Sequence, residues 1–297
     1  MIRLFILSCL LITSCSDDDA ADNLPVTTGA NYSFSRAEFD ETYSLLVSSL
    51  RDAGPVSIVA QVDHRSNASR VNQELRNTST VFFGNPALGT PFMQQNQQAG
   101  LDLPQKFAVY ENENELTTVI YNSVDYLNAR HGVDPESGDM VAQALSNFAS
   151  SATDNSVRSN GTRVSLNQGV RTVVSDQDFE TTYSTLISTL QSNSNISIVA
   201  ELDHQANAAS VNMTLRPTRV VIFGNPALGT PLLQEGSSIA LDLPQKMLVY
   251  ESADGSVNIA YNDAVYIAQR HGISGQSENL ETINMALSNL ANTAAGR

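Results

Sequence analysis

The sequence predicts an α+β fold that is built twice, as two tandem copies of a two-layer α/β sandwich. The stretch VFFGNPALGTP at 81–91 recurs as VIFGNPALGTP at 221–231, and LDLPQK at 101–106 recurs at 241–246. Both matches have the same offset of 140 residues, which indicates a tandem duplication rather than a solenoid of short repeats. Within each copy, helical and strand patterns alternate irregularly, which favours a mixed sheet with helices mainly on one face.

Capping residues mark where helices are expected to begin. Ser35 with Glu38, and Ser175 with Asp178 in the second copy, match the capping box that precedes an apolar helical stripe. Asp63 is the expected N-cap of a further short helix. Apolar runs and turn residues predict the other elements of the first copy, which are strands 57–62 and 80–83, a turn or short helix at Asn85-Pro86, a hairpin of 106–111 and 117–122, and helices near 124–130 and 140–148.

Composition and charge exclude several classes of protein. The chain has 297 residues, of which 41% are hydrophobic and 16% charged, so each copy can bury an ordinary core. It carries a formal net charge of −15, which repels phosphate backbones and argues against nucleic-acid binding. The two cysteines, Cys9 and Cys15, both lie near the N-terminus. The folded body therefore has neither a disulfide framework nor a cysteine nucleophile.

The N-terminal residues resemble a bacterial lipoprotein signal peptide. Arg3 precedes a short apolar run that ends in Ile-Thr-Ser-Cys, which matches a lipobox with cleavage before Cys15 and lipid attached to its thiol. The Cys-Ser-Asp-Asp-Asp start resembles the export signal of surface lipoproteins in the Bacteroidetes group. This implies an outer membrane lipoprotein, periplasmic or surface-exposed, that contacts the membrane through its lipid anchor. The expected segments are a signal peptide at 1–14, an acidic tether at 15–29, a first repeat at 30–150, a linker at 151–167 and a second repeat at 168–297.

Five motifs recur in both copies and carry a family resemblance. They are Asp-His-x-x-Asn-Ala, Phe-Gly-Asn-Pro-x-x-Gly-Thr-Pro, Leu-Asp-Leu-Pro-x-Lys, Tyr-Asn and Arg-His-Gly, and they extend over about 35–132 and 175–272. This pattern resembles the DUF302 family. The resemblance implies a TT1751-like α/β fold for each copy. It implies no particular activity, because the family has no established general function.

The candidate binding residues occur as matched pairs in the two copies. Neutral imidazole commonly binds haem iron and transition metals, so the histidines are candidate ligands of either. The loop after Asn85 could present backbone N–H groups to an anion, and Lys106 could face a ligand or extend to solvent. No His-x-x-x-His spacing occurs, so a metal site would have to be assembled across the fold. The candidates are His64, Asn67, Asn85, Lys106 and His131, with His204, Asn207, Asn225, Lys246 and His271 as their counterparts; the four histidines are also the candidate metal ligands.

The function that these residues favour is non-enzymatic binding of a small ligand, whose identity the sequence leaves open; haem and transition metals are the candidates. Each copy is expected to hold one ligand between the helix that begins at His64 and the loop at Asn85. This geometry requires the strands that end at Asp63 and Gly84 to be parallel neighbours. Two alternatives remain open: an enzyme with His64 or His131 as general base, and a structural or interaction protein without a ligand. The repeats are expected to pack through equivalent surfaces, as an internal pseudo-dimer.

Overall fold

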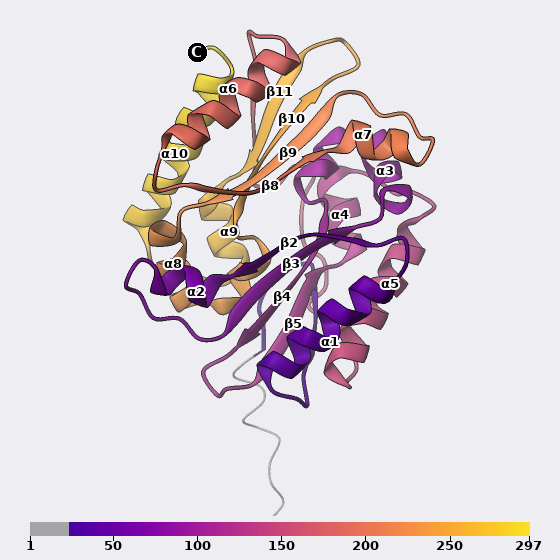
Figure 1. Cartoon of the computed structure of the whole chain (residues 1–297), viewed down its shortest axis with the longest axis vertical. Coiled ribbons are helices and arrows are strands. Elements are labelled where there is room, and N and C mark those ends of the chain that lie inside the picture. The colour runs from indigo at the N-terminus through magenta and orange to yellow at the C-terminus, as the bar shows by residue number, and fades with distance from the viewer. Residues whose placement is uncertain (1–23) are drawn as a thin grey trace, which may run out of the picture.

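The computed structural model describes residues 24–297, which form two sheets and their helices (Figure 1). The expected signal peptide, the lipidation site Cys15 and the acidic residues directly after it lie outside the described residues. Within 24–297, none of the helices has the length and apolar character needed to cross a membrane.

The first copy is built around an antiparallel sheet with the strand order β2-β3-β4-β5-β1-β6. Its central strands β3, β4 and β5 are rich in β-branched and aromatic residues, which suit a buried pleated surface. The strands are β1 (Ala30–Phe34), β2 (Ser57–Asp63), β3 (Thr78–Gly84), β4 (Gln105–Glu111), β5 (Thr117–Asn122) and β6 (Arg158–Ser159).

Two long helices of the first copy, α1 (Phe39–Asp52) and α5 (Gly138–Thr153), cover one face of this sheet. Phe39, Leu46 and Leu50 form the apolar stripe of α1 and lie in the core beneath it. The shorter helices lie in the connections and are α2 (His64–Ser69), α3 (Pro86–Gln95), the 3-10 helix η2 (Gln97–Leu101) and α4 (Val124–His131).

The second copy repeats this plan with the strand order β7-β11-β10-β9-β8, and α6 packs with α10 over one face of the sheet. Its strands are β7 (Val170–Val174), β8 (Ser197–Asp203), β9 (Thr218–Gly224), β10 (Gln245–Glu251) and β11 (Val257–Asn262). Its helices are α6 (Phe179–Ser192), α7 (His204–Ser210), α8 (Pro226–Glu235), η3 (Ser237–Leu241), α9 (Ala264–Arg270) and α10 (Ser277–Ala294).

The copies pack together through the sheet faces that their long helices leave uncovered. The segment η2 of the first copy lies on β9, β10 and β11, and η3 of the second copy lies reciprocally on β3, β4 and β5. Helix α2 contacts α8 and α7 contacts α3, as Figure 1 also shows. Each sheet therefore has its own helices on one side and the other copy on the other side.

Burial on both faces explains why the strands read as continuous apolar runs. In β3, Val81 and Phe83 lie in the core beneath α1 and α5, whereas Phe82 between them packs against Ile222 of the second copy. A strand with one solvated face would alternate apolar and polar residues, and these strands do not. The second buried face is supplied by the other copy.

The α+β class and the tandem copies are confirmed, but several sequence expectations require correction. The sheets are antiparallel throughout the described residues rather than mixed. The N-caps are Glu38 for α1 and Asp178 for α6, not Ser35 and Ser175, because these helices begin at Phe39 and Phe179. The strands β1 and β7 were not predicted. Part of the expected linker forms β6, an edge strand beside β1.

Candidate functional site

The first concentration of predicted residues is a cavity of about 380 Å³ between the copies, called here the inter-repeat cavity. Asn85 of the first copy lines it together with His204 and Asn207 of the second copy. Its remaining walls are mostly apolar side chains of the first copy, namely Val56, Val59, Phe83, Leu88, Phe92, Met93, Leu103, Val141, Leu145 and Phe148. A largely apolar cavity with a few polar groups at one side is typical of small-molecule sites.

Local capping positions the polar wall of this cavity. The Asn85 side chain accepts a hydrogen bond of 3.0 Å from the Ala87 N–H and so starts α3 with Pro86 in its first turn. Asp203 caps α7 in the same way, accepting from the Ala206 N–H at 2.8 Å. The contact between α3 and α7 brings these two capped helix starts to one cavity. The expected cap at Asp63 is confirmed in the first copy, with 2.8 Å to the Ser66 N–H.

The charges around the inter-repeat cavity are negative. Glu201 and Asp203 line it, and neither lysine nor arginine is among the lining residues in the described chain. The Asp203 carboxylate also accepts from Arg219, and Glu201 accepts from the Tyr183 hydroxyl, so both carboxylates are held in place. A ligand carboxylate would face these like charges. The rim therefore favours a ligand that donates hydrogen bonds, and it disagrees with the anion-binding loop expected from the sequence.

The pair His64 and His204 lies at the start of α2 and α7, and both side chains are buried. Burial lowers the pKa of each from 6.5 to about 4, so both imidazoles are neutral at neutral pH. His64 Nε2 lies 3.1 Å from the Thr80 hydroxyl, which in turn donates to the Ala240 carbonyl oxygen at 2.9 Å. His204 Nε2 has no hydrogen-bond partner in the described chain, because Val220 stands where the first copy has Thr80.

The expected site within each copy is wrong, because the strands run the other way. β2 and β3 are antiparallel, with Asp63 opposite Ser79 and Ser57 opposite Gly84. The strand ends at Asp63 and Gly84 therefore lie at opposite ends of the pair. The reciprocal packing of the copies replaces this arrangement: α7 meets α3, and α2 with His64 and Asn67 meets α8, which begins after Asn225.

The second concentration of predicted residues is a charged group buried between the sheets, called here the central cluster. It contains Lys106 and His131 with their counterparts Lys246 and His271, all of them predicted candidates. It also contains residues that the sequence reasoning did not single out, which are Asp102, Asn122, Tyr126, Arg130 and their counterparts Asp242, Asn262, Tyr266 and Arg270. Ten of these twelve side chains belong to motifs present in both copies, namely LDLPQK, Tyr-Asn and Arg-His-Gly.

Arginine side chains connect the copies within the central cluster. Arg130 donates to Asp102 of its own copy at 2.8 Å and to Asn262 of the other copy at 2.7 Å. Arg270 makes the reciprocal bonds, to Asp242 at 2.6 Å and to Asn122 at 2.8 Å. Both guanidinium groups are buried, so each needs these partners to offset the loss of hydration. The cluster therefore holds the copies in register.

The two aspartates of the cluster remain ionised. Burial acts to raise the pKa of Asp102, but the Arg130 charge, the His131 hydrogen bond and the Lys106 charge hold it well below its usual range. The pKa of Asp242 is held low in the same way by Arg270, His271 and Lys106. His131 Nε2 lies 2.7 Å from Asp102, and His271 Nε2 lies 2.9 Å from Asp242. Each imidazole therefore donates from Nε2 to a carboxylate.

The predicted residues thus lie at three places instead of converging on one. His64 and Asn67 lie on α2, which contacts α8, and Asn225 directly precedes α8. Asn85, His204 and Asn207 line the inter-repeat cavity, whereas both lysines and the pair His131 and His271 belong to the central cluster. Within residues 24–297 no group of three or more His, Cys, Asp or Glu side chains could hold a metal ion. The central cluster also surrounds its two carboxylates with four basic side chains, a donor set unsuited to a cation.

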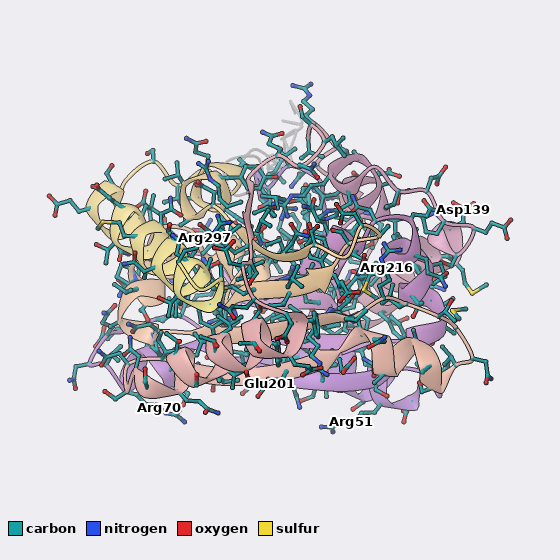
Figure 2. The ribbon with its side chains drawn as sticks, turned by 90° about the horizontal axis from the view of Figure 1, so that it is seen from above. Arg51, Arg70, Asp139, Glu201, Arg216 and Arg297 are labelled. Carbon is teal, nitrogen blue, oxygen red and sulfur yellow. The ribbon has the colours of Figure 1, made fainter. Side chains whose placement is uncertain are left out.

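Composition also sets the two predicted lysines apart from the other cationic residues. Lys106 and Lys246 are the only lysines in the chain, and every other cationic side chain apart from histidine is arginine. Both are 1% exposed, whereas arginines such as Arg51 and Arg70 lie at the edge of the molecule (Figure 2). Lysine is normally a surface residue. A lysine found solely at one matched pair of positions indicates a special role for that pair.

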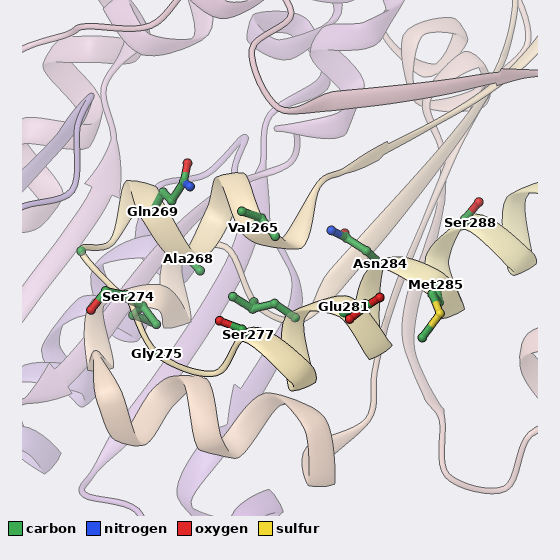
Figure 3. Close-up of a pocket in the computed structure, with 13 residues that line it drawn as sticks. Val265, Ala268, Gln269, Ser274, Gly275, Ser277, Glu281, Asn284, Met285 and Ser288 are labelled. Carbon is green, nitrogen blue, oxygen red and sulfur yellow. The ribbon is translucent and has the colours of Figure 1, made fainter.

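A larger, more open groove of about 780 Å³ lies in the second copy between α9 and α10 (Figure 3). Val265, Leu280 and Met285 contribute apolar surface to it, and Asn284 and Glu281 contribute polar groups. None of the candidate residues from the sequence lines this groove. It is therefore a weaker candidate site than the inter-repeat cavity.

Fold and site together define a protein of two tandem α+β domains that enclose a cavity and a charged cluster between them. The family model described as "Domain of unknown function DUF302" matches residues 32–152 and 171–290, so the chain belongs to the DUF302 family. A solved structure, the uncharacterized conserved protein DUF302 from Bacillus stearothermophilus, is similar with 16% identity and a TM-score of 0.39. That similarity covers 42% of this chain and 98% of the solved one.

Curated relatives match a shorter part of the chain. Two proteins named "Fluoride-specific ion channel FluC 1", from Brucella suis and Brucella abortus, are 39% identical to it over 83 residues. These residues are 28% of this chain and 33% and 31% of the two relatives. The chain thus spans about a third of the length of the curated relatives that it matches. The named channel activity refers to those whole proteins.

Proposed function

We propose that this protein binds one small, largely apolar organic molecule in the inter-repeat cavity and is held at the cell envelope by a lipid on Cys15. The observation that carries the proposal is the joint lining of one cavity by Asn85, His204 and Asn207, which come from different copies. Three residues chosen from the sequence as ligand contacts meet there because the copies pack reciprocally. At this cavity the proposed stoichiometry is one ligand per chain.

The lining defines the chemical class of the ligand. Aromatic and aliphatic side chains such as Phe83, Met93 and Phe148 favour an apolar body, and their burial of that body supplies the affinity. Asn85, Asn207 and the carboxylates Glu201 and Asp203 favour a hydrogen-bond donor or a cationic group on it. Haem fits this rim poorly, because its two propionates would meet two carboxylates. A neutral or cationic amphipathic molecule is the class that we propose.

Filling the cavity should abolish binding. Ala144 lies on α5 and lines the cavity, so Ala144→Phe places a ring in the space that the ligand would occupy. The probe is N-phenyl-1-naphthylamine, a neutral apolar fluorophore with one N–H donor. We expect saturable binding to the wild-type chain and at least about tenfold weaker binding to Ala144→Phe, equivalent to about 1.4 kcal/mol. Fluorescence titration measures both.

Two comparisons make this experiment decisive. Ala142→Phe adds the same ring on an exposed turn of α5 that does not line the cavity, so it should bind the probe like the wild-type chain. Equal affinity of the wild-type chain and Ala144→Phe would contradict the proposed site. Haemin that binds tightly with a shifted Soret band, and that Ala144→Phe excludes, would instead contradict the proposed ligand class.

Lipid attachment is tested separately. Cys15→Ala should move the protein from the membrane fraction to the soluble fraction and prevent incorporation of a palmitate analogue, because the lipobox loses its only thiol. Cys9→Ala, which changes the expected signal peptide ahead of the lipobox, should leave both properties unchanged. A Cys15→Ala protein that stays with the membranes after a high-salt wash would show that the lipobox interpretation is wrong.

A further inference from the structure

The two lysines of the chain meet where the sheets face each other. Lys106 on β4 pairs in register with Phe82, and Lys246 on β10 pairs with Ile222. Phe82 and Ile222 pack in one apolar cluster between the copies, so the two lysines are carried to the same interface. Neither lysine is among the residues that line the inter-repeat cavity. The lysine pair is therefore a feature separate from the proposed ligand site.

The charges of the central cluster do not balance. Asp102 and Asp242 are each paired with an arginine, at 2.8 Å and 2.6 Å. Lys106 Nζ lies 3.8 Å from Asp102 Oδ1 and 3.6 Å from Asp242 Oδ1, which is too long for a hydrogen bond. Lys246 Nζ has no carboxylate oxygen within ion-pair distance in the described chain. Two arginines and two lysines thus surround two carboxylates.

The lysine nitrogens also have no hydrogen-bond partners. Lys106 Nζ and Lys246 Nζ are both buried and unpartnered within residues 24–297, and so is Asp102 Oδ1. An ammonium group has three donors, and leaving them unmet away from water is costly. Burial, and next to it the Lys106 charge, holds the pKa of Lys246 well below its usual range. Within residues 24–297, no acceptor therefore lies within hydrogen-bond distance of either lysine nitrogen, and the nearest carboxylate oxygens are those of Asp102 and Asp242 beside Lys106.

We propose that Lys106 and Lys246 together bind one small monovalent inorganic anion, of the size of fluoride or chloride, between the two copies. Such an anion accepts hydrogen bonds from both Nζ groups, and its negative charge favours the protonated form of Lys246 and offsets part of the surplus positive charge. A small ion suits the place because both lysines are buried and line neither the inter-repeat cavity nor the groove between α9 and α10. Larger oxyanions such as sulfate would need more room and more donors. The anion then joins the copies, since each lysine comes from a different repeat.

NMR spectroscopy can observe the lysines directly, because a sample labelled with ¹⁵N-lysine contains only two Nζ nitrogens. We expect sodium fluoride or sodium chloride, added to a sample prepared in sodium gluconate, to shift both Nζ signals with one saturation curve. Sodium sulfate at the same ionic strength should leave them unchanged. Lys246→Met identifies the Lys106 signal and should remove its response to halide. Nζ signals that do not respond to either halide would overturn the proposal.

Thermal unfolding gives a second measurement of anion binding, which does not depend on the NMR signals of the lysines. For the wild-type chain, the thermal unfolding midpoint should rise by roughly 2–4 °C for each tenfold increase in halide above its Kd. Lys246→Met should lose this halide-specific rise and should unfold at a higher temperature than the wild-type chain in gluconate, because it removes an unpartnered buried amine. Arg51→Met, which removes an exposed cation, should keep the halide response.

The competing arrangement is a pair of lysines that shares one proton, with an ammonium group donating to a neutral amine. In that case Lys246→Met would remove the acceptor and destabilise the chain equally in gluconate and in halide. The wild-type midpoint would then depend on ionic strength alone. That combination of results would overturn the anion site and would leave the inter-repeat cavity untouched, since the cavity is tested by Ala144→Phe.

Discussion

Asp102→Asn is expected to destabilise the protein by about 3–5 kcal/mol, the cost of breaking a buried ion pair by removing one partner. The substitution keeps the shape of the side chain but leaves Arg130, His131 and Lys106 without their carboxylate. Asp242→Asn should have a similar effect through Arg270 and His271. Urea unfolding followed by far-UV circular dichroism measures the change. This probe suits a chain without tryptophan.

An exposed ion pair provides the matched control. Asp176 pairs with Arg297 at 3.1 Å on the surface, so Asp176→Asn should not measurably change the free energy of unfolding. Because the arginines of the central cluster bond to the opposite copy, we also expect both copies to unfold in one transition. Wild-type stability in Asp102→Asn, or separate transitions for the two copies in the wild-type chain, would contradict the structural role assigned to the cluster.

Acidification from about pH 7 to about pH 4.5 should lower the free energy of unfolding by about 2 kcal/mol for each of His64 and His204. Burial lowers the pKa of both imidazoles to about 4 in the folded chain, against 6.5 when unfolded. Between these values the unfolded chain binds protons that the folded chain does not. Stability therefore rises with pH through this window and is lost as pH falls.

The double variant His64→Gln, His204→Gln separates this effect from other titrating groups. Its stability at neutral pH will be lower, but the loss between about pH 7 and about pH 4.5 should shrink by about 4 kcal/mol. A remainder is expected from His271, whose pKa is also lowered, chiefly by burial. Asp102 and Asp242 contribute mainly below this window, because an unfolded aspartate takes up a proton at about pH 3.9, whereas in the folded chain both pKa values are held well below the usual range. An unchanged pH dependence in the double variant would show that these histidines are not buried in the neutral form.

Most of the secondary structure could be predicted from the sequence repeat and from local residue patterns. Gapless repetition at an offset of 140 residues indicated the two copies, and the hairpin 106–111 with 117–122 and the cap at Asp63 are confirmed. These signals succeed because capping and hairpin pairing depend on residues close together in the chain. The strands β1 and β7 were missed, since each pairs with a partner far along the sequence.

No local pattern in the sequence predicts which of the candidate residues share a site in the folded chain. His64 and Asn85 belong to one copy and were expected at one site, yet the cavity combines Asn85 with His204. The reason is the antiparallel pairing of β2 with β3, together with the reciprocal contact of α3 with α7. Neither the direction of a neighbouring strand nor the partner of a helix across an interface is encoded in a spacing of residues.

The sequence alone determines that the chain contains two copies of one domain, with matched His, Asn and Lys residues, and that it carries a strong negative charge. Tertiary structure decides what those residues do. It buries Lys106 and Lys246 beside Asp102 and Asp242 and leaves Asn85 and His204 around a cavity. The physical reason is that each sheet has two apolar faces and its own helices cover only one. The other copy must cover the second face, and this packing brings together residues 120 or more positions apart, as Arg130 and Asn262 are.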